Sequence, residues 1–83
     1  MLKIHTQRYG NIAILCLQGR IVTGQIESLA NAVNSQSDVG AMILDLSRIS
    51  RIDARGLGAM LDLRQQAQAS GIAFKLMNVT TLV

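Results

Sequence analysis

Two largely apolar runs constrain the fold of this chain more than any other feature of its sequence. They are "IAILCL" at residues 12–17 and "AMILDL" at 41–46, and both are typical of buried strands. We expect the first to be covered on both faces, as in the middle of a covered sheet. The segment between them has the spacing of an amphipathic helix, through Ile26, Leu29, Ala30 and Val33. A strand, a helix and a strand in this order predict a parallel pair with a right-handed crossover.

Three further segments complete the predicted order of elements. Residues 2–7 alternate between apolar and polar, which favours a half-buried edge strand, and Gly10-Asn11 predicts a turn into an antiparallel hairpin. Residues 72–79 predict a last strand. Residues 56–71 have the period of a helix, marked by Leu57, Met60, Leu61, Arg64, Ala67 and Gln68. Leu63 widens the apolar face of this helix, and Gly71 is placed to end it. The expected fold is one α/β domain over residues 1–83, in the order ββαβαβ, with the helices packed on the sheet.

Two polar residues are candidate helix caps. Thr23 precedes the first helix, where its hydroxyl is expected to accept a hydrogen bond from a free first-turn amide. Asp53 precedes the second helix, after a connection expected at residues 47–52. Its carboxylate is expected to accept from the amide of Arg55 or Gly56, and a negative charge is also favourable at this end of a helix.

Composition excludes several classes of protein. The chain has 83 residues and a net charge of +3 with its basic residues spread out, and Tyr9 and Phe74 are its aromatics, so nucleic-acid binding is poorly supported. It contains neither an apolar run long enough to span a bilayer nor a secretory signal, so no membrane partner is expected. The single cysteine, Cys16, fits a reducing cytoplasm and is expected to be a small core residue.

The sequence does not place catalytic or metal-binding groups together. The single histidine, His5, falls on the predicted edge strand and is expected to face solvent. Asp45 and Asp53 lie near one end of the predicted sheet, where a strand residue and a cap account for them. No metal-ligand spacing occurs. We therefore expect no enzyme, no cofactor and no metal.

The stretch "SRIDARGLGAM", residues 50–60, is the strongest candidate for a functional site. It lies beyond the carboxyl end of a predicted parallel strand, which is where open α/β sheets place their sites. Gly56 and Gly58 allow the backbone to approach either the sheet or an outside molecule closely. "GLG" lacks the spacing of a dinucleotide fingerprint and the lysine of a P-loop, so a nucleotide site is only weakly indicated.

The segment "LDLSRISRIDARGLGAML", residues 44–61, resembles the signature of the STAS domain, the fold of bacterial anti-sigma-factor antagonists. "LCLQGRIVTGQIESL" and "FKLMNVT" resemble the preceding and following parts of the same family, so the resemblance covers essentially the whole chain. It implies a STAS-like mixed sheet from which the family's C-terminal helix-strand-helix is missing after Val83. The chain is then a fragment, a natural short form or a processed form. We expect a second copy to cover the C-terminal strand, giving a homo-dimer or higher oligomer.

The resemblance also implies a mechanism of regulation. Family members of the partner-switching type bind an anti-sigma factor that is a serine kinase, and their phosphoacceptor directly precedes the glycine of the signature. In this chain that position is Arg55, after Ala54, and arginine cannot accept the phosphate. The nearest hydroxyls, Ser47 and Ser50, do not match the acceptor position, and Ser50 is a weak candidate. The expected partner-binding residues are Ser50, Asp53, Ala54, Arg55, Gly56, Leu57 and Gly58.

Arg55 leaves several interpretations open. A cation in the first turn of a helix opposes the macrodipole by about 0.3–1 kcal/mol. An acidic partner surface would offset this cost, and Arg48 and Arg51 would then add to a basic rim around Arg55. A small anion held by the helix N-terminus together with Arg55 would also offset the cost. Alternatively Arg55 is solvated and pairs loosely with Asp53 or Asp62. The functional hypotheses are therefore a regulatory protein-binding domain, an anion or nucleotide sensor, and a self-assembling structural subunit.

Overall fold

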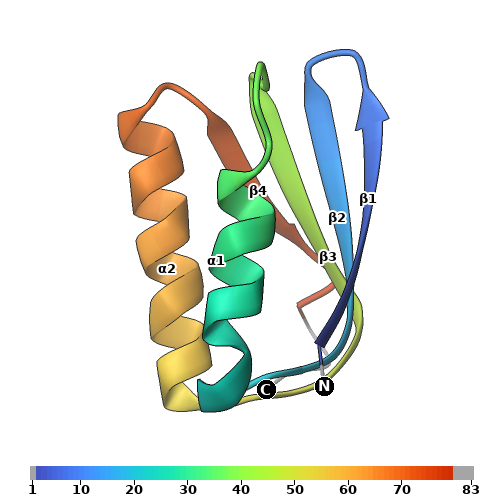
Figure 1. Cartoon of the computed structure of the whole chain (residues 1–83), viewed down its shortest axis with the longest axis vertical. Coiled ribbons are helices and arrows are strands. Elements are labelled where there is room, and N and C mark those ends of the chain that lie inside the picture. The colour runs from blue at the N-terminus through green and yellow to red at the C-terminus, as the bar shows by residue number, and fades with distance from the viewer. Residues whose placement is uncertain (1, 80–83) are drawn as a thin grey trace.

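A four-stranded sheet carries both helices on one face in the computed structural model, which describes residues 2–79 (Figure 1). The elements are β1 Leu2–Tyr9, β2 Ile12–Ile21, a 3-10 turn Thr23–Gln25, α1 Ile26–Asn34, β3 Ala41–Ile52, α2 Ala54–Ala69 and β4 Ala73–Met77. The strand order is β1-β2-β3-β4. β1 and β2 are antiparallel, whereas β3 runs parallel to both β2 and β4. The predicted α/β class, the ββαβαβ order and the edge position of the first strand are confirmed.

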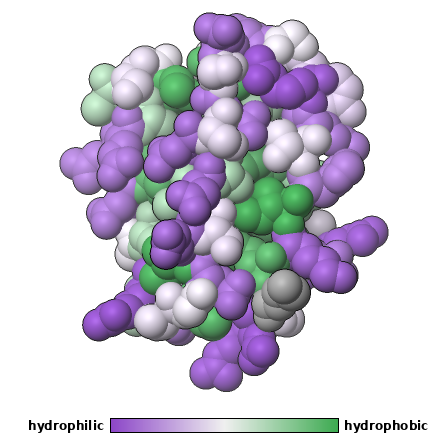
Figure 2. All heavy atoms as spheres, viewed as in Figure 1, coloured by the Kyte–Doolittle hydropathy of each residue, from purple (hydrophilic) through white to green (hydrophobic). Residues whose placement is uncertain are grey.

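The core lies between the sheet and the two helices. Every second residue of β2 and β3 points into it, because side chains alternate between the faces of a strand. These residues are Ala13, Leu15, Leu17, Met42, Leu44 and Leu46, all 2% exposed or less. Leu29 and Val33 of α1 and Met60 and Leu63 of α2 meet them from the helix side. In Figure 2, hydrophilic residues dominate the outer surfaces of the helices, and the largest hydrophobic area in view lies in the seam between α1 and the sheet.

The sheet face that points away from the helices, hereafter the open face, contradicts one expectation. β2 was expected to be covered on both faces, but within residues 2–79 no element covers this side. Ile12 is exposed, and Ile14 and Ile43 are only half-buried. Cys16 is on the open face and half-buried, so it is not the core residue expected from its type. A continuous apolar run indicates low polarity on both faces of a strand, but it does not say what packs on them.

β3 is longer than expected. It continues to Ile52, so residues 47–52 form a strand rather than the predicted connection. The pairing of β3 with β2 shifts register twice, between Cys16 and Gln18 and between Gly19 and Arg20, and each shift gives β3 one extra residue. Such bulges break the two-residue alternation of a strand. The sequence pattern of this part of β3 was therefore not recognisable as a strand.

The two helices begin and face differently from the prediction. Thr23 does not cap α1, because it opens the 3-10 turn and the helix starts at Ile26 with no side-chain cap. In α2 the buried positions are Gly56, Met60, Leu63 and Ala67, whereas Leu57 and Leu61, expected on the buried face, are about half exposed. Gly71 follows the end of α2 with a φ of 80° and donates to the carbonyl of Gln68, as expected of a helix-ending glycine.

Candidate functional site

Asp53 lies between the end of β3 and the start of α2, and its carboxylate joins two parts of the chain. Oδ1 accepts from the backbone N–H of Gly56 at 2.7 Å, which confirms the helix cap and selects Gly56 over Arg55 as the donor. Oδ2 accepts from the backbone N–H of Thr23 at 3.0 Å and from its hydroxyl at 3.1 Å. The start of α2 is therefore tied to the turn that follows β2.

These hydrogen bonds favour the charged form of the carboxyl group. The N–H of Gly56 lowers the pKa of Asp53 below its ordinary value, and the N–H and hydroxyl of Thr23 lower it further, with a smaller contribution from the charge of Arg51. Desolvation acts in the opposite direction but does not reverse the shift. Asp53 therefore places a fixed negative charge at the N-terminus of α2, where the helix dipole is positive.

The two glycines of the motif differ in what surrounds them. Gly56 is buried, and a methyl group at this position would collide with the carbonyl oxygen of Ile21 at the end of β2. Asp53 donates its N–H to the same carbonyl at 3.2 Å, so α2 begins in direct contact with the β2 backbone. Gly58 is exposed, and the space around its Cα is open. Close packing onto the sheet thus explains Gly56 but not Gly58.

The outer side of the α2 start presents a surface to solvent. We define this α2 entry surface by its exposed residues Ala54, Arg55, Leu57, Gly58 and Leu61. Leu57 and Leu61 are 49% and 47% exposed, one helical turn apart. A hollow of about 300 Å³ adjoins Leu57, with a mainly apolar lining of Leu46, Ile52, Asp53, Ala54, Leu57, Met60, Leu76 and Val79. The surface thus combines exposed leucines, one arginine and an apolar recess.

The remaining predicted site residues lie elsewhere. Ser50 occupies the second bulge of β3, and its hydroxyl donates to the carbonyl of Gly19 at 3.1 Å. Arg48 pairs with Gln18, and Arg51 with Arg20, so both arginines project from the open face of β3. α2 packs against the opposite face of the sheet (Figure 1). The basic rim expected around Arg55 therefore does not form as one surface.

Asp45 and Asp53 do not form a pair. Asp45 lies on the open face, where its Oδ1 accepts from the amide of Asn78 at 2.9 Å and from the N–H of Ser47 at 3.0 Å. The hydrogen bond from Asn78 is the main cause that lowers the pKa of Asp45. Sequence reasoning missed Thr23 and Asn78 as partners of these carboxylates. They lie 30 and 33 residues away in the chain, beyond the reach of any local pattern.

Two other classes of site are absent from the described part of the chain. Among residues 2–79, no three His, Cys, Asp or Glu side chains lie together in a way that could hold a metal ion. No helix within the same range has the length and apolar character needed to cross a membrane.

Comparison with known proteins identifies a family. The model of the STAS domain matches residues 3–83. The antisigma-factor antagonist STAS domain from Rhodobacter sphaeroides superposes with a TM-score of 0.84 at 16% identity, over 99% of this chain and 96% of that one. The unphosphorylated anti-sigma factor antagonist SpoIIAA superposes with a TM-score of 0.74 at 19% identity, over 92% of this chain and 73% of that one. At these identities the likeness shows a shared fold.

A longer protein contains a similar domain. The crystal structure of Mglu matches with a TM-score of 0.85 at 25% identity, over 95% of this chain but 20% of that one. This chain therefore spans about a fifth of the Mglu chain. No curated protein sequence matches it.

Proposed function

The chain belongs to the STAS domain family, and we propose that it is a non-catalytic regulatory domain that binds a protein through the α2 entry surface. The partner class that we propose is an anti-sigma factor or a related serine kinase. Two structures of similar fold are anti-sigma-factor antagonists by name, and this likeness supports the choice of partner. The proposed contact residues are those of the α2 entry surface together with Asp53. Gly56 is buried against the backbone of β2 and Ser50 lies in a bulge of β3, so these two predicted residues are left out of the proposed contact.

The exposure of Leu57 and Leu61 is the observation that carries the proposal. A helix in a small domain normally turns its leucines to the core, yet α2 buries Met60 and Leu63 and leaves these two outside. Apolar groups gathered on one surface beside a polar rim mark interaction sites, and arginine is enriched in protein interfaces. Gly58 adds an opening in the helix surface through which a partner can approach the backbone.

The proposed mode of control differs from phosphorylation of the signature position. Arg55 occupies that position and carries no hydroxyl. The hydroxyl of Ser50 is engaged with the carbonyl of Gly19, and Ser50 lies within β3 rather than on α2. We therefore propose that the domain binds its partner constitutively or is controlled by another route.

The anion-sensor alternative at the same helix end is weaker. An anion held by the α2 N-terminus would need the first-turn amides, but Asp53 already accepts from Gly56 there. Its carboxylate would also repel a second negative charge. A saturable thermal shift with phosphate, GTP or GDP that Arg55→Ala abolishes would favour this alternative over protein binding.

Affinity capture from the source cell lysate tests the proposal. We expect wild type to retain a kinase-like anti-sigma factor, and Arg55→Glu and Leu57→Ala to retain at least tenfold less, which corresponds to about 1.4 kcal/mol. Lys75→Glu is the matched control, because it reverses one exposed charge on β4 and lies outside the α2 entry surface. Equal capture by all four proteins would show that this surface does not make the contact.

A further inference from the structure

We propose that the open face carries a second binding site, for a small molecule with a multivalent oxyanion such as a phosphate ester. The site lies at the end of the sheet where β1 begins and β2 and β3 end. It is separate from the α2 entry surface, because α2 covers the opposite face (Figure 1). The proposal therefore does not depend on the protein-binding function.

The two bulges of β3 create this site by bringing cations into rows. A row here is a set of cross-strand neighbours in the sheet. Gln18 is the neighbour of Lys3 on β1 and of Arg48 on β3, which forms one row. In the next row, Arg20 is the neighbour of Arg51. Without the extra residues of β3, Arg48 would alternate onto the helix side of the sheet. Consecutive rows on one face are about 7 Å apart. Four of the eight Lys and Arg residues of the chain thus lie in two neighbouring rows.

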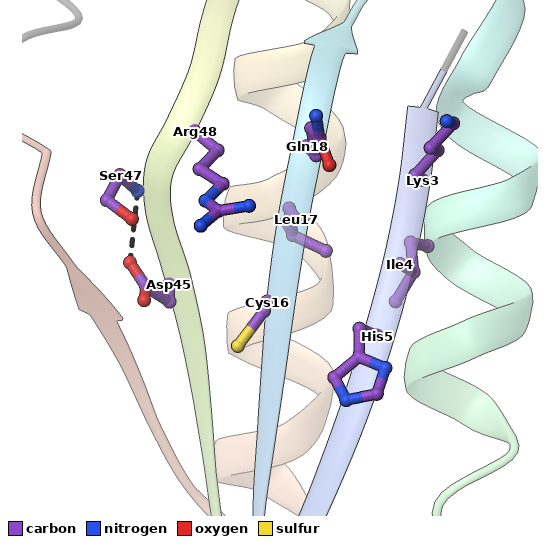
Figure 3. Close-up of a pocket in the computed structure, with 9 residues that line it drawn as sticks. All are labelled: Lys3, Ile4, His5, Cys16, Leu17, Gln18, Asp45, Ser47 and Arg48. Carbon is purple, nitrogen blue, oxygen red and sulfur yellow. Dashed lines mark hydrogen bonds between the residues drawn. The ribbon is translucent and has the colours of Figure 1, made fainter.

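Lys3 and Arg48 border a hollow of about 510 Å³, a volume within the range of small-molecule sites, and Arg20 and Arg51 form the neighbouring row. Figure 3 shows Lys3 and His5 on β1, Cys16 and Gln18 on β2, and Arg48 reaching from β3 toward β2. The lining therefore offers a guanidinium, an ammonium and an amide around a floor that contains a thiol. Arginine and lysine are the side chains that recognise phosphate and carboxylate groups.

The one carboxylate in the hollow does not neutralise these cations by hydrogen bonding. Oδ1 of Asp45 accepts from Asn78 and Ser47, and the charge of Arg48 is the smallest of the effects on its pKa. Arg20 and Arg51 are direct cross-strand neighbours, and like charges in that position repel each other. A bound dianion attracts both arginines and so offsets their mutual repulsion. Anion binding would therefore explain why two arginines lie side by side here.

A small ligand fits these features better than a macromolecule does. The cations gather at one end of the open face beside a concave surface, whereas a nucleic acid would require a longer basic track with aromatic residues for stacking. The exposed aromatic residue, Tyr9, pairs with Ile12 at the opposite end of the sheet. Phosphates and polycarboxylates share the required chemistry, and so does the headgroup of an anionic lipid, so the experiment must separate these sources.

Cys16 provides the readout, because it is the only cysteine of the chain and lines the hollow. The rate of its alkylation by N-ethylmaleimide is measured at fixed ionic strength against increasing pyrophosphate or citrate, with affinity measured separately by calorimetry. We expect saturable protection of the thiol by either probe. Arg48→Gln and Arg20→Gln should each weaken binding by about tenfold, the value of one lost charge-assisted contact.

Controls make each outcome decisive. Arg64→Gln removes an exposed charge from α2 and should bind like wild type. Circular dichroism melting establishes that each variant is folded. If Arg48→Gln does not fold, Arg48→Lys is used in its place. Loss of protection in Arg48 and Arg20 variants, with retention in Arg64→Gln, supports the site. Equal weakening in all variants, absence of saturation, or binding only to phosphatidylglycerol vesicles or to oligo(dT) would overturn the proposal.

Discussion

Asp53 shows how a single residue can fix the geometry of the motif. Its two carboxylate oxygens hold the N–H of Gly56 and both donors of Thr23, so α2 and the turn after β2 share one anchor. Gly56 next to it permits the close contact with the carbonyl of Ile21. Arg55, Leu57 and Gly58 are consequently presented outward from a start of α2 that is held in place.

The charge of Asp53 predicts a dependence of stability on pH. Because folding lowers the pKa of Asp53, the unfolded chain binds more protons, and stability is lost as the pH falls through the folded-state pKa, below about pH 4. Asp53→Asn retains a capping oxygen but no charge. We expect its melting temperature to lie below that of wild type at pH 7, and the difference to shrink as the pH falls below about 4. A constant difference across this range would contradict the role of the charge.

The glycines provide a matched pair of substitutions. Gly56→Ala should destabilise the fold by about 1–3 kcal/mol, because the added methyl group meets the Ile21 carbonyl. Gly58→Ala should stabilise it by about 0.5–1 kcal/mol, because alanine is the better helix former and the space is open. Urea unfolding measures both. If the proposed function is right, Gly58→Ala will bind the partner less well despite its greater stability.

At the scale of elements, α2 and β3 each serve two purposes. α2 packs on the sheet through Met60, Leu63 and Ala67 and exposes Leu57 and Leu61 on another side. β3 supplies the core residues Met42, Leu44, Leu46 and Ile49, and its two bulges leave Arg48 and Arg51 on the open face. The exposed leucines of α2 and the bulged part of β3 both differ from the pattern expected of a helix or a strand. Each of them lies where a binding surface is proposed.

The orientation of α2 can be tested with two leucines that lie two positions apart. Leu63→Ala should cost about 2–5 kcal/mol of unfolding free energy, because Leu63 is only 6% exposed and packs in the core. Leu61→Ala should change it by less than about 0.5–1 kcal/mol, because Leu61 is 47% exposed. Chemical denaturation distinguishes them. Similar costs for both substitutions would mean that α2 is rotated from the orientation described.

For the whole molecule, the uncovered sheet is the dominant feature. The helices protect one face, whereas the open face exposes apolar and basic residues, and β1 and β4 form the two edges within residues 2–79. Met77 on β4 and Val79 just beyond it are 42% and 41% exposed. An edge strand with exposed apolar side chains favours pairing with another chain.

We therefore expect self-association through the β4 edge, and sedimentation equilibrium should show a dimer or higher oligomer that dissociates on dilution. Met77→Lys should shift the equilibrium toward monomer, because a charge on an edge strand opposes pairing. Tyr9→Lys places the same charge on the β1 edge, where Tyr9 is 59% exposed, and should have a smaller effect. A monodisperse monomer at all concentrations would exclude this association.

The sequence by itself determined the class of fold, the order of elements, the hairpin, the capping role of Asp53 and the glycine that ends α2. These features depend on hydrophobic periodicity and on hydrogen bonds within a few residues, which a local pattern carries. The STAS signature likewise located the motif at residues 50–60, because its residues are contiguous.

Only the tertiary structure decided which faces are covered, where β3 ends, and which leucines of α2 are exposed. These outcomes depend on contacts between distant segments, such as Thr23 with Asp53 and Asn78 with Asp45, and on a register between β2 and β3 that shifts twice. The row of Lys3, Gln18 and Arg48 draws on three strands and exists because of a bulge. No local pattern of residues predicts it, since bulges follow from the pairing of strands and not from the periodicity of one strand.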